Sequence, residues 1–231
     1  MNRPSSAKPP AKTAPLFWEC PECGFLSRDP AFADAATPCP LCRRTDGVRR
    51  TFPPDRQRQL DERIRVYSSD GESEIVVILS AALLEALLED ILDRIMAAHG
   101  ADVPMRSTVL DQVRAIGARV GKLFPELTGE EFEAATAELG YQDFPKRWRK
   151  LREVRNAFIH DTPYRDVQRE LDQAVAADAL GLLDQAYRLF VLLNNRFVAD
   201  GLKGLRRSSD RPPLNIHGVP ADSGTAEAVE P

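Results

Sequence analysis

The sequence predicts a mainly α-helical protein, in which a helical bundle follows a small zinc-ribbon module. Two observations carry this prediction. All four cysteines of the 231-residue chain form two Cys-x2-Cys pairs near the N-terminus. Beyond residue 70, apolar residues recur at helical spacing in several segments, and the second half has no strand-like run. With 43% apolar and 29% charged residues, the composition is that of an ordinary globular protein.

Composition and charge narrow the classes of function. The net charge of −4 gives no overall attraction to nucleic acid, so any RNA affinity has to come from local basic patches. The longest apolar run, residues 75–84, is followed by Glu85, Glu89 and Asp90, which argues against a membrane span. The N-terminus lacks the apolar core of a secretory signal. We therefore expect a cytoplasmic, reducing location, although four cysteines in a secreted protein could form two disulfides.

The chain divides into five expected parts. Residues 1–15 are rich in Pro, Ala, Ser and Lys and are predicted to be disordered. Residues 16–52 hold the cysteines, and residues 53–70 are predicted to be a connector with room for one short helix. Residues 71–202 carry the helical pattern. Residues 203–231 are predicted to be a disordered tail.

The first two expected helices have clear ends. Residues 71–99 are apolar over most of the helix circumference, as in a helix buried inside a bundle. Gly100 supplies the stop. The second helix is expected over residues 107–124, with Ser107 as its N-cap and Pro125 beyond its end.

Three further helices complete the expected bundle. The third covers residues 128–139, where Thr128 and Glu131 have the spacing of a capping box. The fourth covers residues 144–160 and is strongly basic. The fifth, over residues 162–199, keeps a single apolar stripe at helical spacing.

The four cysteines have the spacing of a metal centre. Cys20 and Cys23 form the first pair, Cys39 and Cys42 form the second, and fifteen residues separate the pairs. Zn²⁺ prefers four thiolates at tetrahedral corners, and each Cys-x2-Cys turn presents two of them from one loop. Because four protein ligands close the coordination sphere, we expect structural rather than catalytic zinc. A mononuclear iron centre and a redox pair are the alternatives.

Aromatic and basic residues surround the cysteines. Trp18, Phe25 and Phe32 are expected to cover a core that is too small to be stable without metal. Four arginines follow the second pair, and the sequence leaves open whether they contact phosphates or lie in a solvated loop: Arg43, Arg44, Arg49 and Arg50.

The fourth expected helix ends in a short polar motif formed by Arg155, Asn156 and His160. Arg155 falls inside the apolar stripe of the helix, where a guanidinium needs a carboxylate or phosphate partner. Asn156 and His160 fall on the other side if the helix stays regular. Either the helix ends before His160, or two chains meet so that residues of both line one cleft. In the plainer interpretation Arg155 snorkels from the core edge and His160 caps the helix.

A basic run precedes this motif on the same helix. Such a run usually marks a solvated face, but its place beside Arg155 favours contact with phosphates. The predicted RNA-binding residues are Lys146, Arg147, Arg149, Lys150 and Arg152.

The arginine, polar residue and histidine of this motif resemble the signature of HEPN domains, small helical bundles of which many are ribonucleases. The first expected helix adds to the resemblance, because the run Ser-Ala-Ala-Leu-Leu before Glu85 is similar to the opening helix of several bacterial HEPN families. Glu85, Glu89 and Asp93 lie along one edge of that helix. Each is a candidate partner for Arg155, or else the three form a solvated acidic edge. The resemblance covers residues 71–199.

The resemblance implies a metal-independent endoribonuclease that acts at a dimer cleft. His160 would activate the ribose 2′-hydroxyl or protonate the leaving 5′-oxygen. Arg155 would stabilise charge on the phosphate, Asn156 would orient the substrate or the histidine, and Glu85 completes the candidate catalytic set. The implied partners are RNA, a second copy of the chain and, for a toxin or defence effector, an antitoxin or regulatory protein.

Two other function classes stay open. The chain is either a non-catalytic HEPN-like module that binds RNA or a protein, or a zinc-ribbon adaptor whose helical half only dimerises. Catalysis requires Arg155 and His160 to converge on a concave surface, whereas the binding module tolerates their separation. The adaptor predicts that the basic run points away from any cleft.

Overall fold

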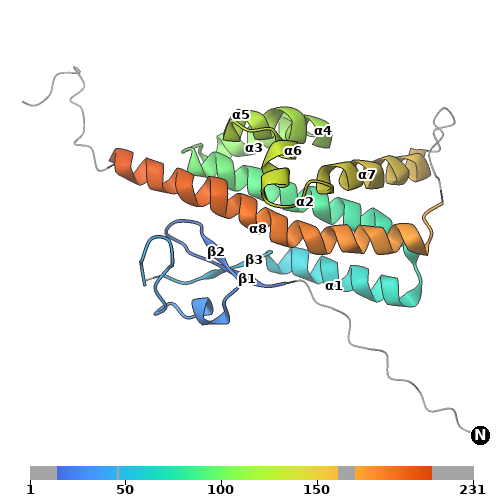
Figure 1. The fold of residues 1–231 in the computed structure, drawn as a ribbon, viewed down its shortest axis with the longest axis horizontal. Helices are drawn as coiled ribbons and strands as arrows, with labels where there is room; N and C mark the ends of the chain where they lie inside the picture. The colour runs from blue at the N-terminus through green and yellow to red at the C-terminus, as the bar shows by residue number, and fades with distance from the viewer. Residues whose placement is uncertain (1–14, 46, 161–169, 210–231) are drawn as a thin grey trace, which may run out of the picture.

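A bundle of helices with a small sheet packed at its side makes up the structure (Figure 1). The computed structural model describes residues 15–45, 47–160 and 170–209, with side chains up to Val198. The two longest helices lie side by side through the bundle. The predicted fold class, a mainly helical bundle preceded by a small module of zinc-ribbon type, is confirmed.

The N-terminal module is a three-stranded antiparallel sheet. Its central strand is β1 (Phe17–Glu19), which pairs with β2 (Leu26–Ser27) on one side and β3 (Arg50–Phe52) on the other. Trp18 in the middle of β1 lies opposite Thr51 of β3. The strands thus begin and end within the segment predicted from the cysteine spacing.

A short 3₁₀ turn, η1 (Pro30–Ala33), fills the long loop between β2 and β3. The Asp29 carboxylate caps it by accepting a hydrogen bond from the Ala31 backbone N–H at 2.9 Å. Phe32 is thereby turned inward and packs with the cysteines as the core of the module.

Most of the predicted connector, residues 53–70, is in fact a helix of the bundle. Helix α1 (Asp55–Asp70) begins after two prolines and ends at Gly71, whose φ of 85° supplies the left-handed C-cap that favours glycine. It packs against the next helix along its length. The helical part of the chain therefore begins at Asp55.

The full length of helix α1 was not predicted, because its buried face is partly polar. Asp61 is fully buried and accepts hydrogen bonds from Arg65 Nε at 2.7 Å and from the Tyr187 hydroxyl at 3.2 Å. Arg65 Nη2 also donates to Asp184 at 2.6 Å. An apolar stripe is the sequence pattern typical of a packed helix, and in α1 an ion pair occupies part of that stripe.

Helix α2 (Ser73–Ala98) is the centre of the bundle. Its long run of buried apolar residues contacts α1 and α8 as well as the shorter helices α3, α5 and α7. The expectation of a helix surrounded by protein, made for residues 71–99, is confirmed.

The single helix expected over residues 107–124 is wrong. The chain instead forms four short pieces in succession, which are α3 (Val103–Gln112), α4 (Ile116–Ala118), the π-helical turn η2 (Arg119–Leu123) and α5 (Phe124–Thr128).

A buried arginine explains the break. Asp102 rather than Ser107 caps α3, accepting from the Met105 backbone N–H at 2.9 Å. Past the end of α3, Arg119 reaches back and donates to the Val113 carbonyl at 2.7 Å and the Leu110 carbonyl at 3.1 Å. These carbonyls would otherwise lack partners at the end of the helix.

The third expected helix starts later than predicted. Helix α6 covers Phe132–Glu138 and follows Glu131 rather than Thr128. The Thr128 hydroxyl donates to the Phe124 carbonyl at 2.8 Å, so it closes α5 and does not cap α6. Gly129, at a φ of 74°, separates the two helices.

The last two helices are long. Helix α7 (Phe144–His160) has the predicted limits. Helix α8 (Gln173–Ser209) continues into the predicted tail. The other expectations of disorder, and the expected start of the fifth helix, concern segments that lie outside the described residues. These segments are residues 1–14, 161–169 and 210–231.

Two asparagines join α8 to the sheet. Asn194 Nδ2 donates to the Gly24 carbonyl at 2.8 Å. The Asn195 side chain accepts from the Leu26 backbone N–H at 2.8 Å and donates to the Leu26 carbonyl at 2.9 Å. Phe17 and Leu26 of the sheet also belong to the apolar core of the bundle, so the module and the bundle share one core.

Candidate metal centre and nucleic-acid interface

The four cysteine sulfurs lie together as a metal centre requires. Their Sγ atoms are all within 4.8 Å of one another, and the Cys20–Cys42 and Cys23–Cys39 distances are both 3.7 Å. A tetrahedral Zn²⁺ with Zn–S bonds of about 2.3 Å holds its sulfurs about 3.8 Å apart. The cysteines are free, and 3.7 Å is far longer than a disulfide bond.

The two cysteine loops repeat one backbone pattern. In the first, the Cys20 N–H donates to the Phe25 carbonyl and the Gly24 N–H donates back to Cys20, both at 2.9 Å. In the second, Cys39 and Arg43 make the equivalent bonds at the same distance. Gly24 and Arg43 both have positive φ, 67° and 64°. The repeat presents two thiols from each loop toward a common point.

Arg49 is the residue of this centre that the sequence did not single out. It is 8% exposed, and it donates from Nη1 to Cys20 Sγ at 3.5 Å and from Nη2 to the Thr37 carbonyl at 2.9 Å. Its guanidinium also lies 4.3 Å from the centre of the Phe32 ring. Among the described residues, no carboxylate lies within ion-pair distance of it.

Burying a cation without a partner costs free energy, so negative charge near Arg49 would stabilise the fold. Four thiolates around a dication carry a net charge of about −2, which supplies it. Burial raises the pKa of the free Cys23 thiol, and the neighbouring Cys20 and Cys39 add to the increase. A bound dication reverses this effect, because it favours the thiolate. The donor set and its surroundings therefore fit a metal–thiolate centre. The other three arginines, Arg43, Arg44 and Arg50, are exposed.

Arg155 has a carboxylate partner on α2. Its Nη2 donates to Glu85 Oε1 at 2.6 Å, and both side chains are partly buried. Of the three acidic candidates, Glu85 is therefore the partner. Glu89 instead accepts from Arg119 and Asp93 from Arg106, each at 2.7 Å.

His160 lies away from Arg155 within one chain. Helix α7 stays continuous through His160, so the alternative in which it ends before His160 is wrong. Five residues along a helix correspond to about 140° around its axis. Asn156 and His160 are both exposed. Arg155 and His160 therefore do not share a face of α7 within one chain.

The buried stripe of α7 leaves out an apolar residue near the end of the helix. Trp148, Leu151, Val154 and Ala157 are buried, whereas Phe158 is 37% exposed. The apolar side chain of Phe158 thus lies on the surface close to the end of the helix.

The predicted RNA-binding residues differ in their surroundings. Arg147 is held by Asp178 at 2.5 Å and by Gln185 at 2.9 Å, both on α8, and Arg149 pairs with Glu133 of α6 at 3.1 Å. The other three have no ion pair within the described part of the chain: Lys146 and Lys150 are exposed, and Arg152 is half-buried.

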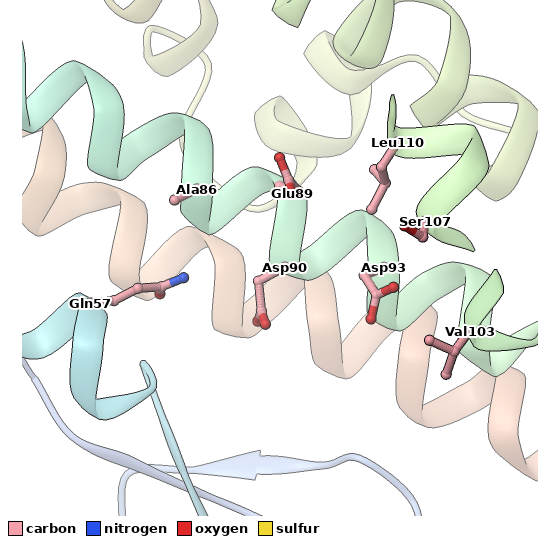
Figure 2. A pocket seen from close by; sticks show the side chains of 8 residues that line it. All are labelled: Gln57, Ala86, Glu89, Asp90, Asp93, Val103, Ser107 and Leu110. Atoms are coloured by element: carbon pink, nitrogen blue, oxygen red, sulfur yellow. The ribbon is translucent and has the colours of Figure 1, made fainter. Parts of the chain in front are cut away.

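The acidic edge of α2 lines a hollow of about 420 Å³ between α1, α2 and α3. Figure 2 shows Glu89, Asp90 and Asp93 projecting from α2 among residues of α1 and α3. Each carboxylate is engaged by an arginine, and Asp90 accepts from Arg94 at 2.7 Å. A hollow lined by carboxylates does not suit RNA phosphates, so the basic surface of α7 is the better candidate.

No protein-family model, curated protein or solved structure matches the chain. Of the helices in the described ranges, none combines the length and the apolar character needed to cross a membrane. Inference about function therefore depends on the two sites described above.

Proposed function

We propose that the chain is a zinc-bearing endoribonuclease of the HEPN type that cleaves RNA between two copies of itself. The observation that carries the proposal is the Glu85–Arg155 pair, which fixes one guanidinium nitrogen at the edge of the basic helix α7. Arginine has five donors, and Glu85 engages one terminal nitrogen, so donors remain for a phosphate.

The metal in this proposal is structural Zn²⁺. The closed set of four thiols, Cys20, Cys23, Cys39 and Cys42, and the 3.7 Å sulfur separations support it. Zinc would hold the two cysteine loops together and take no part in RNA cleavage. A reducing, cytoplasmic location would keep the thiols free for the metal.

The geometry of α7 supports a homodimer in this proposal. Arg155 and His160 lie on different sides of the helix, so a second chain has to bring its own residue to complete the pair. Phe158 and Ile159, 37% and 47% exposed, form an apolar surface directly beside His160. Covering this surface with a second copy would favour association and would bring His160 into a cleft.

The proposed reaction needs no metal. The ribose 2′-oxygen attacks the adjacent phosphorus as the bond from phosphorus to the 5′-oxygen breaks. His160 takes the 2′-hydroxyl proton or gives a proton to the leaving oxygen, and water makes the other of these two proton transfers. Arg155 stabilises the charge on the phosphate, and Asn156 orients the RNA. The products are a 2′,3′-cyclic phosphate and a free 5′-hydroxyl.

Complementation tests both the residues and the dimer. Arg155→Ala and His160→Ala should each lower cleavage of an RNA panel by about 10²–10⁴ in the presence of EDTA. Mixing the two variants under conditions that allow chain exchange should restore about a quarter of wild-type activity, because half of the dimers regain one intact site. Wild-type helical circular dichroism and dimer mass are the controls.

Two outcomes contradict the proposal. Wild-type cleavage by a folded His160→Ala variant removes the nuclease assignment. If activity does not recover in mixtures that are shown to exchange chains, the site is not formed by Arg155 of one chain and His160 of the other.

A non-catalytic RNA-binding module is the second candidate. The separation of Arg155 and His160 around α7 favours it, because a binding surface does not require the two side chains to converge. This candidate predicts RNA binding that weakens with salt and is lost with the basic residues of α7, without any cleavage.

A further inference from the structure

A small cavity of about 140 Å³ lies where α7 meets α6 and the π-helical turn η2. It has room for a few water molecules, which suits one phosphate group better than a nucleoside. The residues that matter for its chemistry are Gly117, Gly121, Glu133, Trp148, Arg149 and Arg152.

One residue of the cavity wall, Trp148, has a buried donor without a partner among the described residues. Trp148 is 2% exposed, and its Nε1–H has no hydrogen-bond acceptor among the described residues. Buried tryptophan N–H groups usually find an acceptor. An oxygen atom of a ligand in the cavity would provide one.

Positive charge exceeds negative charge at the cavity wall. Arg149 and Glu133 neutralise each other across 3.1 Å, whereas Arg152 has no carboxylate within ion-pair distance in the described part of the chain. Burial lowers the pKa of Arg152, and the nearby Arg155 and Arg149 lower it further against the opposing effect of Glu85. An anion in the cavity would relieve this repulsion.

Two glycines leave the space open. A Cβ atom added at Gly117 or Gly121 would meet nothing within 4 Å. Gly121 lies in η2, and π-helical turns often occur at functional sites. The cavity can therefore be filled by mutation without altering a charge.

We propose that this cavity binds one phosphate group of an RNA chain through Arg152 and the Trp148 indole N–H. Arg152 lies one helical turn before Arg155 on α7, so the bound phosphate would neighbour the one at Arg155. The RNA source of the phosphate rests on the function proposed above, whereas the phosphate site itself does not.

The indole resonance of Trp148 reports binding directly. The chain has two tryptophans, so a ¹⁵N-labelled sample gives two indole signals, which Trp148→Phe assigns. Titration with inorganic phosphate, and separately with a short 2′-O-methyl RNA that cannot be cleaved, should shift the Trp148 signal saturably. The Trp18 signal, from the zinc module, should not move.

Matched variants test the site. Arg152→Gln should weaken binding about tenfold or more, because a charge-assisted bond is lost. Gly121→Leu should abolish binding with every charge retained, and Gly117→Ala should weaken it. Lys122→Ala, which removes an exposed charge close to the cavity, should leave binding unchanged.

The outcomes separate the two proposals. A saturable shift with either probe supports the phosphate site, and a shift with the oligonucleotide identifies RNA as its source. If the Trp148 signal shifts saturably but the wild-type protein does not cleave RNA, the phosphate site is supported and the nuclease assignment is contradicted. No saturable shift with either probe, or equal binding by Gly121→Leu and wild type, overturns the site.

Discussion

At the scale of single residues, Arg49 shows how a buried charge can reveal a missing partner. Its guanidinium lies against a cysteine sulfur, a backbone carbonyl and an aromatic ring, without a carboxylate among the described residues. In the sequence it is one of four arginines after the second cysteine pair. Only the fold separates it from the other three, because it buries Arg49 directly before β3 and leaves the others exposed.

Arg49→Met should weaken zinc binding by about 10–100-fold, as loss of residues that support metal ligands commonly does. Arg49→Lys should retain part of the affinity, because the charge remains. Competition with a chromophoric chelator measures the zinc affinity. Arg50→Met, a change at an exposed neighbour, is the control. Equal affinities for Arg49→Met and wild type would show that the arginine does not stabilise the centre.

Tyr187 makes the stability of the protein sensitive to alkaline pH. Burial raises the pKa of its hydroxyl, and the adjacent Asp61 raises it further. The folded protein therefore keeps a proton that the unfolded chain loses above a pH of about 10. The free energy of unfolding should consequently be unaffected by this group at lower pH and fall as the pH rises above about 10.

Tyr187→Phe removes this contribution. Between pH 10 and 11, the wild type should lose up to about 1.4 kcal/mol of stability more than the variant does. Urea unfolding at both pH values measures the difference, and other titrating groups cancel because both proteins carry them. Parallel losses in the two proteins would contradict the prediction.

At the scale of elements, the sequence predicts the helices whose buried faces are apolar. Helix α7 has its predicted limits because Phe144, Leu151 and Val154 repeat at helical spacing. Helix α1 was not expected in full, because Asp61 and Arg65 occupy its buried face. Periodicity does not reveal such a helix, because an ion pair within the helix takes the place of apolar residues, and its further partners, Asp184 and Tyr187, lie more than a hundred positions away.

The candidate sites, like the helices, were predictable only in part from the sequence. The cysteine spacing predicted which sulfurs meet, and the acidic edge of α2 narrowed the partner of Arg155 to three residues, of which Glu85 makes the contact. The separation of Arg155 and His160 depends on where α7 ends, and element ends are set by distant contacts. The cavity beside Trp148 depends on η2, whose π-helical form has no clear sequence pattern.

Arg119 should control the break between α3 and α5. It holds two backbone carbonyls of the preceding segment and pairs with Glu89 at 2.7 Å. Arg119→Met keeps much of the side-chain volume but leaves these acceptors without their donor, so the free energy of unfolding should fall by about 1–3 kcal/mol.

Arg114→Met is the matched control, because Arg114 lies in the same segment with its side chain 81% exposed. Its effect should stay within about 0.5 kcal/mol. Chemical denaturation monitored by circular dichroism compares the two variants. Similar effects of both would show that the Arg119 contacts do not hold the break in place.

At the scale of the whole molecule, the zinc module and the bundle should unfold as coupled parts. Phe17, Leu26 and Phe52 of the sheet belong to the core that α2 and α8 build. Loss of the metal should therefore reach beyond the cysteine loops and reduce the packing of the bundle.

Stripping the metal with a strong chelator should leave most of the helical circular dichroism at 25 °C, because the helices lie outside the module. The melting temperature should nevertheless fall, by about 4–8 °C for a loss of about 2 kcal/mol in a chain of this size. Added Zn²⁺ should restore it. An unchanged melting temperature in protein shown to be metal-free would mean that the module does not support the bundle.

The contacts that Asn195 of α8 makes with Leu26 also affect whether the edge of the sheet can pair with another chain. Asn195 offers Leu26 one acceptor and one donor, the same pair that a neighbouring strand would offer. The outer edge of β2 is thereby occupied at the point where another chain could otherwise add a strand. A side chain on a helix thus occupies the sheet edge at the point where a strand of another chain would have to pair.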